Sequence, residues 1–193
     1  MRKRIFLSIT MLVISASSAN AQSVWGGRVS LSHYIEKATY SNEQIYNHKG
    51  IELGPVLYYP LKDNLYLNTG AMLGIMIPEH GDHIINFYVD IPVYLGVQIP
   101  TKKSNLSYCG QAGPYLGFWR STSDMINNFI NPVQAGLGII AGMNVKRFKL
   151  ELGYKTGLTN LVSVNEGQVI NGDLYMESKS KLSSLFFGIS YVF

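Results

Sequence analysis

The feature that most constrains this chain is a period-two alternation of side chains that recurs in segments of about ten residues. In residues 133–145 every odd position is apolar, whereas the even positions are mostly small or polar. Such alternation is the pattern of a β-strand with two different faces. The same pattern recurs in residues 51–59, 65–76, 89–99, 148–155 and 184–193, and more loosely in 24–34 and 106–119. The sequence therefore predicts eight strands.

The second face of these strands distinguishes a membrane barrel from a soluble one. A soluble sheet turns a face rich in Lys, Glu and Thr to water, but here that face carries glycines, tyrosines and few charges. Its charges are three positive and three negative, namely Arg28, Glu52, Asp90, Lys149, Glu151 and Lys155. Balanced charges suit the closed interior of a narrow barrel, where each charge needs a partner. The apolar face would then meet lipid. Prolines at 55, 92, 114 and 132 fit paired strands poorly.

The connections between the predicted strands alternate in length. Short connections are expected at 61–64, 100–104 and 146–147, and the others at about 36–50, 77–84, 120–131 and 161–181. Tight turns at one end and longer loops at the other are typical of outer-membrane barrels. We therefore predict an all-β fold: an eight-stranded, antiparallel, up-and-down transmembrane β-barrel with both termini in the periplasm.

The N-terminal segment has the features of a secretory signal peptide. Basic residues 2–4 precede the apolar run 5–14, and Ala19-Asn20-Ala21 forms a cleavage site. We expect residues 1–21 to be the signal peptide and 22–193 the barrel domain. Removing the three basic residues lowers the formal net charge from +4 to about +1, so the charge does not indicate nucleic-acid binding. The lone Cys109 excludes an intramolecular disulfide.

The chain ends on Phe193, with apolar side chains at 187, 189 and 191. A terminal aromatic residue on an alternating strand is common in outer-membrane barrels, where the assembly machinery reads it. This ending predicts recognition of the last strand by the barrel-assembly machinery.

Short motifs spread along the mature chain carry a family resemblance. They include Gly54-Pro55, Tyr59-Pro60-Leu61, Ile91-Pro92-Val93-Tyr94-Leu95, Gly113-Pro114-Tyr115-Leu116-Gly117, Tyr154-Lys155-Thr156-Gly157 and the closing Gly188-Ile189-Ser190-Tyr191-Val192-Phe193. In their order and spacing the chain resembles the PorT-like group of bacterial outer-membrane β-barrel proteins, common in Bacteroidota. The resemblance implies an outer-membrane location and, for some related proteins, a link to secretion or gliding machinery. Residues 36–50 and 161–181 match no such pattern.

Two polar clusters are candidate sites. Glu79, His80, Asp82 and His83 offer His and carboxylate groups close together, as a metal site requires, but the spacing around Gly81 favours a polar outside loop. Ser32 and His33, with Glu36 nearby, offer the residue types of a lipid-cleaving site, which needs them within mutual reach. We assign neither cluster, and predict no metal, no cofactor and no enzymatic activity.

The aromatic residues fall into two predicted groups. Tyr58, Tyr66, Tyr94, Tyr115 and Phe186 share the interior face with the charges and would fill it, because eight-stranded barrels are only wide enough for side chains. Cys109 falls on the same face. Trp25, Tyr34, Tyr59, Trp119 and Tyr191 lie near strand ends and are expected to form aromatic girdles at the membrane interfaces.

The sequence favours an integral outer-membrane barrel with a closed interior and a structural, adhesive or secretion-machinery-associated role. Its expected partners are outer-membrane lipid and lipopolysaccharide, the assembly machinery and other envelope proteins, with no nucleic acid. Two alternatives stay open. One is a narrow pore for small solutes. The other is a soluble, lipocalin-like periplasmic binder, which needs an apolar cavity inside and a polar outside.

Overall fold

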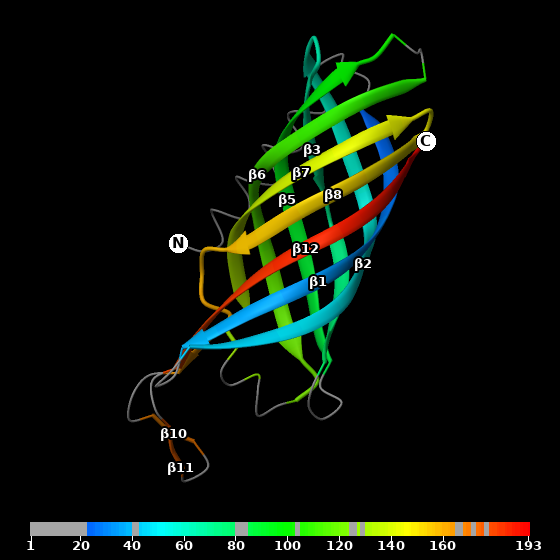
Figure 1. Ribbon diagram of the computed structural model, residues 1–193. Coiled ribbons are helices and arrows are strands. Elements are labelled where there is room, and N and C mark those ends of the chain that lie inside the picture. Colours follow the sequence, from blue (N-terminus) through cyan, green and yellow to red (C-terminus); the bar gives the residue numbers. More distant parts are fainter. Residues whose placement is uncertain are drawn as a thin grey trace.

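The computed structural model describes residues 23–39, 43–79, 85–102, 105–123, 127, 130–164, 168–170, 173–175 and 178–193. Its main element is a closed ring of 8 hydrogen-bonded antiparallel strands (Figure 1). The ring consists of β1 (Val24–Thr39), β2 (Glu43–Lys62), β3 (Leu65–Gly70) continued by β4 (Met72–Pro78), β5 (Asn86–Pro100), β6 (Leu106–Ser121), β7 (Val133–Val145), β8 (Phe148–Gly157) and β12 (Ser178–Val192). The short strands β9 (Val162–Val164), β10 (Gln168–Ile170) and β11 (Asp173–Tyr175) lie outside it.

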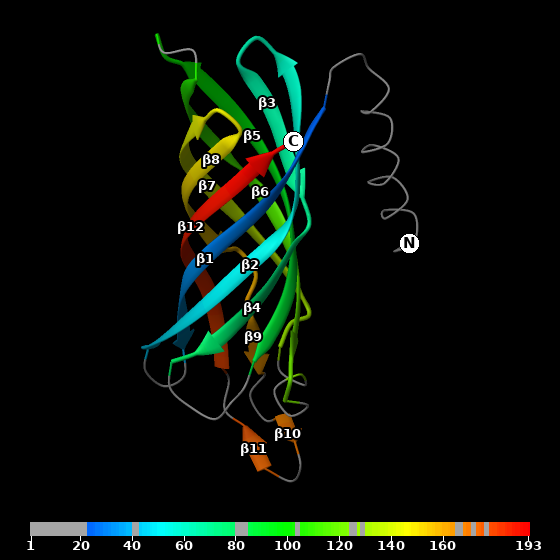
Figure 2. The same cartoon turned by 90° about the vertical axis from the view of Figure 1, so that its right-hand side faces the viewer.

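The ring closes where the last strand pairs with the first. β12 pairs with β1 from Gly26↔Val192 to Thr39↔Lys179, and β1 pairs with β2 along its whole length. Figure 2 shows β12, β1 and β2 side by side. Closure leaves the ring no free edge, so backbone groups within the ring find partners on both sides, as hydrocarbon surroundings require. The predicted eight-stranded antiparallel barrel is confirmed.

The two faces of each strand are oriented as the alternation predicts. Outward side chains are large, apolar and exposed: Leu31 is 61% and Ile139 60% exposed. All six predicted interior charges are buried. This is the reverse of a soluble barrel, whose apolar side chains face inward. Among the described residues, no helix is long and apolar enough to cross a membrane.

Prolines are tolerated in this ring because ladder pairing is interrupted locally. Pro55 in β2 and Pro92 in β5 lack an N–H group and lie on either side of the break between β3 and β4 at Ala71. The Ala71 N–H still donates to the Pro55 carbonyl at 3.2 Å, and Thr69 Oγ1 donates to the Pro92 carbonyl at 2.8 Å. The predicted strand 65–76 is thus one path through the ring, divided at Ala71.

Two of the predicted long connections are wrong in extent. Residues 36–50 were expected to form a loop, but β1 and β2 form a continuous ladder up to Thr39↔Glu43. The range 161–181 contains β9, β10, β11 and the start of β12. Both errors have the same cause, since cross-strand hydrogen bonds form wherever two strands stay adjacent, whatever the polarity of their side chains. The short connections after β2, β5 and β7 share the end that carries the C-terminus, here called the short-turn end (Figure 1).

The predicted girdle is partly wrong. Trp25 and Tyr191 are exposed on the outside, and Tyr59 is half-buried, but Tyr34 (3% exposed) and Trp119 (7%) point into the barrel. Their parity decides this, because Tyr34 is an even number of residues from the interior Arg28 on the same strand. The predicted signal peptide, residues 1–21, lies outside the described part of the chain.

Candidate functional site

The middle of the barrel interior holds an ion cluster around Lys155. Its Nζ atom lies 2.8 Å from Glu52 Oε1 and 2.8 Å from Asp90 Oδ2. The three side chains come from β8, β2 and β5 and are almost completely buried. Tyr34 and Tyr88 donate their hydroxyls to Glu52 Oε1 at 3.1 and 3.0 Å. Two carboxylates therefore share one lysine, and we call this group the Lys155 cluster.

A second ion cluster lies nearer the short-turn end and has the opposite imbalance. Glu151 Oε2 is 3.5 Å from Arg28 Nε, and Glu151 Oε1 is 3.4 Å from Lys149 Nζ. Gln111 donates to Glu151 Oε1 at 2.7 Å, and Lys149 donates to the Tyr66 hydroxyl at 3.2 Å. Here two cations share one carboxylate, and we call this group the Glu151 cluster. Across these two clusters the six charges balance.

Aromatic rings fill the space between the two clusters. The Phe186 ring has the Arg28 guanidinium 4.7 Å from its centroid and Lys155 Nζ at 5.5 Å. Phe186 also packs with Tyr94 and Ile140 in a buried apolar group. Cations over ring faces are attracted by the ring quadrupole. Charged and aromatic side chains from different strands therefore meet at mid-depth in the lumen.

Inward-facing glycines make room for these rings. In each case the ring occupies the position that a Cβ atom on the glycine would take: Gly74 under Tyr88, Gly96 under Tyr66, Gly136 under Tyr115, Gly138 under Tyr94 and Gly153 under Phe186. Covering of strand glycines by aromatic rings is a known device of β-sheets. Small and large side chains thus interlock across the lumen.

A third group lies toward the end of the lumen away from the short turns. Tyr34, Tyr88 and Trp119 pack together, with the Tyr88 and Trp119 rings stacked at 4.3 Å between centroids. Beside them Glu36 Oε2 lies 3.0 Å from His48 Nε2. The sequence interpretation missed His48. The hairpin register could have found it, because Tyr34↔His48 and Glu36↔Tyr46 are cross-strand pairs.

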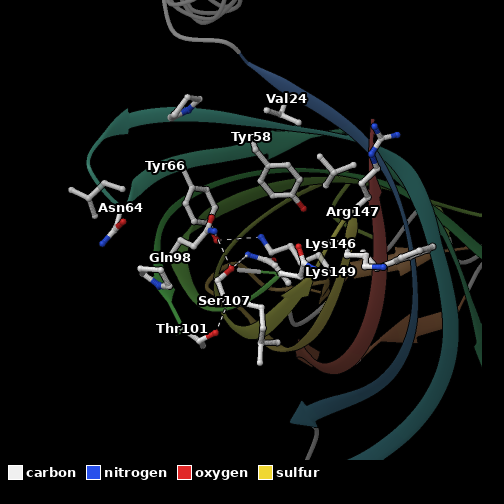
Figure 3. A pocket seen from close by; sticks show the side chains of 18 of the residues that line it. Val24, Tyr58, Asn64, Tyr66, Gln98, Thr101, Ser107, Lys146, Arg147 and Lys149 are labelled. Atoms are coloured by element: carbon white, nitrogen blue, oxygen red, sulfur yellow. Dashed lines mark hydrogen bonds between the residues drawn. The ribbon is translucent and has the colours of Figure 1, made fainter. Parts of the chain in front are cut away.

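A cavity of about 660 Å³ opens at the short-turn end. Figure 3 shows Tyr58, Tyr66, Ser107 and Lys149 around it. Lys149 reaches it from the Glu151 cluster, with Nζ 4.2 Å from the centroid of the Tyr58 ring and 4.9 Å from that of Tyr66. The volume is in the range of small-molecule sites, about 300–1,000 Å³. Of the six interior charges, only Lys149 lines this cavity.

Neither of the two candidate clusters from the sequence is observed as an assembled site. Ser32 is buried in the interior, whereas His33 is exposed on the outer face. Adjacent strand residues point to opposite faces, so these two side chains do not meet, and Glu36 pairs with His48 instead. His80, Asp82 and His83 lie outside the described residues. Within the described ranges, no group of three His, Cys, Asp or Glu side chains is placed to hold a metal ion.

Comparison with known proteins agrees with this architecture. Residues 83–163 match the family described as outer membrane protein beta-barrel domain. Among solved structures, the chain is similar to Neisserial surface protein A (TM-score 0.50, 14% identity, covering 88% of this chain and 97% of that one). It is also similar to the attachment invasion locus protein Ail of Yersinia pestis (0.41, 13%, 87% and 98%) and to the outer membrane enzyme PagL (0.45, 10%, 82% and 97%). No curated protein matches the chain.

The family match and the solved structures support different conclusions. The family match covers the central part of the chain and supports an outer-membrane β-barrel family. Similarity to Neisserial surface protein A at 14% identity shows the shared barrel fold. Nothing in either comparison separates the PorT-like group from other outer-membrane barrels.

Proposed function

We propose that this chain is a non-enzymatic outer-membrane barrel of the PorT-like kind, with a closed interior, that acts through the end opposite the short turns. Its role is structural, adhesive or associated with envelope machinery. The observation that carries the proposal is the contrast between the two parts: the lumen is filled by ion clusters and rings, whereas β1, β2 and β12 continue past the apolar band with charged outward side chains. In this proposal the short turns and both termini lie in the periplasm.

The outer surface beyond the apolar band carries exposed lysines on three adjacent strands. We call Lys37, Lys49, Lys179 and Lys181 the outer basic patch. Lys37 and Lys181 are directly opposite each other in the β1–β12 ladder. Like charges placed directly opposite destabilise a sheet pair. Two ion pairs offset part of the charge of the patch, Lys37 with Glu43 at 3.7 Å and Lys49 with Glu79 at 2.8 Å, but pairs this exposed contribute little. The patch is therefore suited to anionic lipid headgroups, and in this proposal it is the surface that contacts the expected lipid partner.

Replacing both opposed lysines tests this lipid contact. We expect Lys37→Gln with Lys181→Gln to weaken binding of monophosphoryl lipid A to the detergent-solubilised protein roughly 30-fold, since each lysine near an anionic surface contributes about 1 kcal/mol. The matched control is Lys62→Gln with Lys102→Gln, two exposed lysines at the short-turn end. Equal losses from both pairs would show unspecific charge attraction and contradict a site at the patch.

The closed interior is tested by conductance. In planar bilayers we expect the purified barrel to give no unitary current steps, because the Lys155 cluster spans the lumen from β8 to β2 and β5. Eight-stranded barrels have interiors only wide enough for side chains to fill. Current steps whose ion selectivity changes in Lys149→Gln or Glu151→Gln would instead support the narrow pore.

Two other roles fit the geometry less well. A soluble lipocalin-like binder needs an apolar interior, but the interior here is charged and the apolar side chains are exposed. A lipid-cleaving site at Ser32 and His33 lacks the required juxtaposition, since the two side chains lie on opposite faces of β1. Recognition by the assembly machinery is supported by the last strand, where Phe193 is exposed and its N–H donates to the Trp25 carbonyl at 2.9 Å.

A further inference from the structure

The cavity at the short-turn end has a charged floor and a partly apolar lining. Lys149 lies at its floor, between the rings of Tyr58 and Tyr66. Its apolar lining includes Val24 and Val192, which have the same parity on β1 and β12 as the interior Arg28 and Ser190. Ligand sites commonly combine apolar walls with a few polar groups that fix orientation. A ligand suited to this shape has a polar head and an apolar body.

The residues that line the cavity carry a net positive charge, which favours an anionic ligand. Its lining residues include three cations, Lys146, Arg147 and Lys149, and one acid, Asp63. Behind the floor, Glu151 is the one carboxylate within ion-pair distance of Lys149 among the described residues, and it is shared with Arg28. Lys149 is thus incompletely neutralised by direct contacts, in a place where burial strengthens electrostatic attraction. An incoming carboxylate or phosphate would complete its neutralisation.

We propose that this cavity is a binding site for a small organic anion, with its carboxylate or phosphate group on Lys149 and its apolar body against Val24, Val192 and the Tyr58 ring. The site is distinct from the outer basic patch, which lies at the other end of the barrel. A failure of this binding test would therefore leave the proposed function untouched, and the reverse also holds. Given the proposed orientation, the ligand enters from the periplasm.

The test is a titration of the whole barrel, in a nonionic detergent, followed by protein NMR. The probes are benzoate and phenyl phosphate, with benzamide as a neutral control of the same shape. We expect benzoate or phenyl phosphate to shift the resonances of residues around the cavity and to bind at least tenfold more tightly than benzamide. The stronger of the two anions identifies the head group as carboxylate or phosphate.

Three variants make the result specific. Lys149→Gln leaves Arg28 paired with Glu151, so the fold is expected to persist, and it should weaken anion binding at least tenfold. Val24→Trp fills part of the cavity without changing its charge and should also weaken anion binding at least tenfold. Arg120→Gln, an exposed cation on β6 at the other end and outside the outer basic patch, should change nothing. Equal binding of benzoate and benzamide would overturn the proposal. So would unchanged benzoate affinity in a folded Lys149→Gln or Val24→Trp protein.

Discussion

Replacing Lys155 with methionine is expected to destabilise the barrel by about 3–5 kcal/mol, the usual cost of breaking a buried ion pair from one side. The change leaves Glu52 and Asp90 in the interior without the cation that lies 2.8 Å from each of them. Methionine keeps most of the side-chain volume, so packing changes little. The measurement is the free energy of unfolding in urea, for barrels folded into lipid vesicles.

The matched control is Lys149→Met, which removes a cation of similar burial from the Glu151 cluster. Glu151 keeps Arg28 at 3.5 Å, so the expected cost is within about 1 kcal/mol. Restoring neutrality, by adding Glu52→Gln and Asp90→Asn to Lys155→Met, should regain most of the lost stability. Equal losses for Lys155→Met and Lys149→Met would show that packing, and not charge balance, determines the effect.

The sequence could predict which residues face the interior, because the alternation of a strand follows from backbone geometry alone. The odd positions of residues 133–145 are apolar and face outward, so the even positions must face inward. The same alternation on the other strands identifies the interior charges. Tyr34 and Trp119 show the limit of arguing from residue type. Their place near strand ends suggested a girdle, whereas parity from Arg28 on β1 puts Tyr34 inside.

The partners within the interior could not be predicted. Lys155 and Glu52 are 103 residues apart in the chain, and their contact depends on the stagger of all the strands between them. A barrel's shear determines which residues share a level in the lumen, and alternation carries no information about shear. The same holds for the cavity at the short-turn end, because its lining comes from three connections and from the first and last strands of the ring, β1 and β12. Strand ends were equally uncertain, since β1 and β2 stay paired through polar residues up to Thr39↔Glu43.

The glycines of the interior are the basis of a second large effect. Gly153→Ala is expected to cost about 2–3 kcal/mol by overpacking, because the Phe186 ring occupies the position of the new methyl group. Phe186 cannot move away cheaply, since it is 1% exposed and packs with Tyr94 and Ile140. The free energy of unfolding in urea again measures the effect.

Gly110→Ala is the matched control for Gly153→Ala. It adds the same methyl group to β6, but the nearest atom, Val97 Cγ1, is 3.9 Å away, so the expected change is within about 0.5 kcal/mol. A double-mutant cycle with Phe186→Leu then isolates the contact itself. Because leucine is shorter than the ring, Gly153→Ala should cost less in that background, with a coupling of about 1 kcal/mol or more. Additive effects would mean that the cost of Gly153→Ala comes from the backbone of β8 and not from the ring. The glycines of this face would then serve strand curvature instead of interlocking with the aromatic rings.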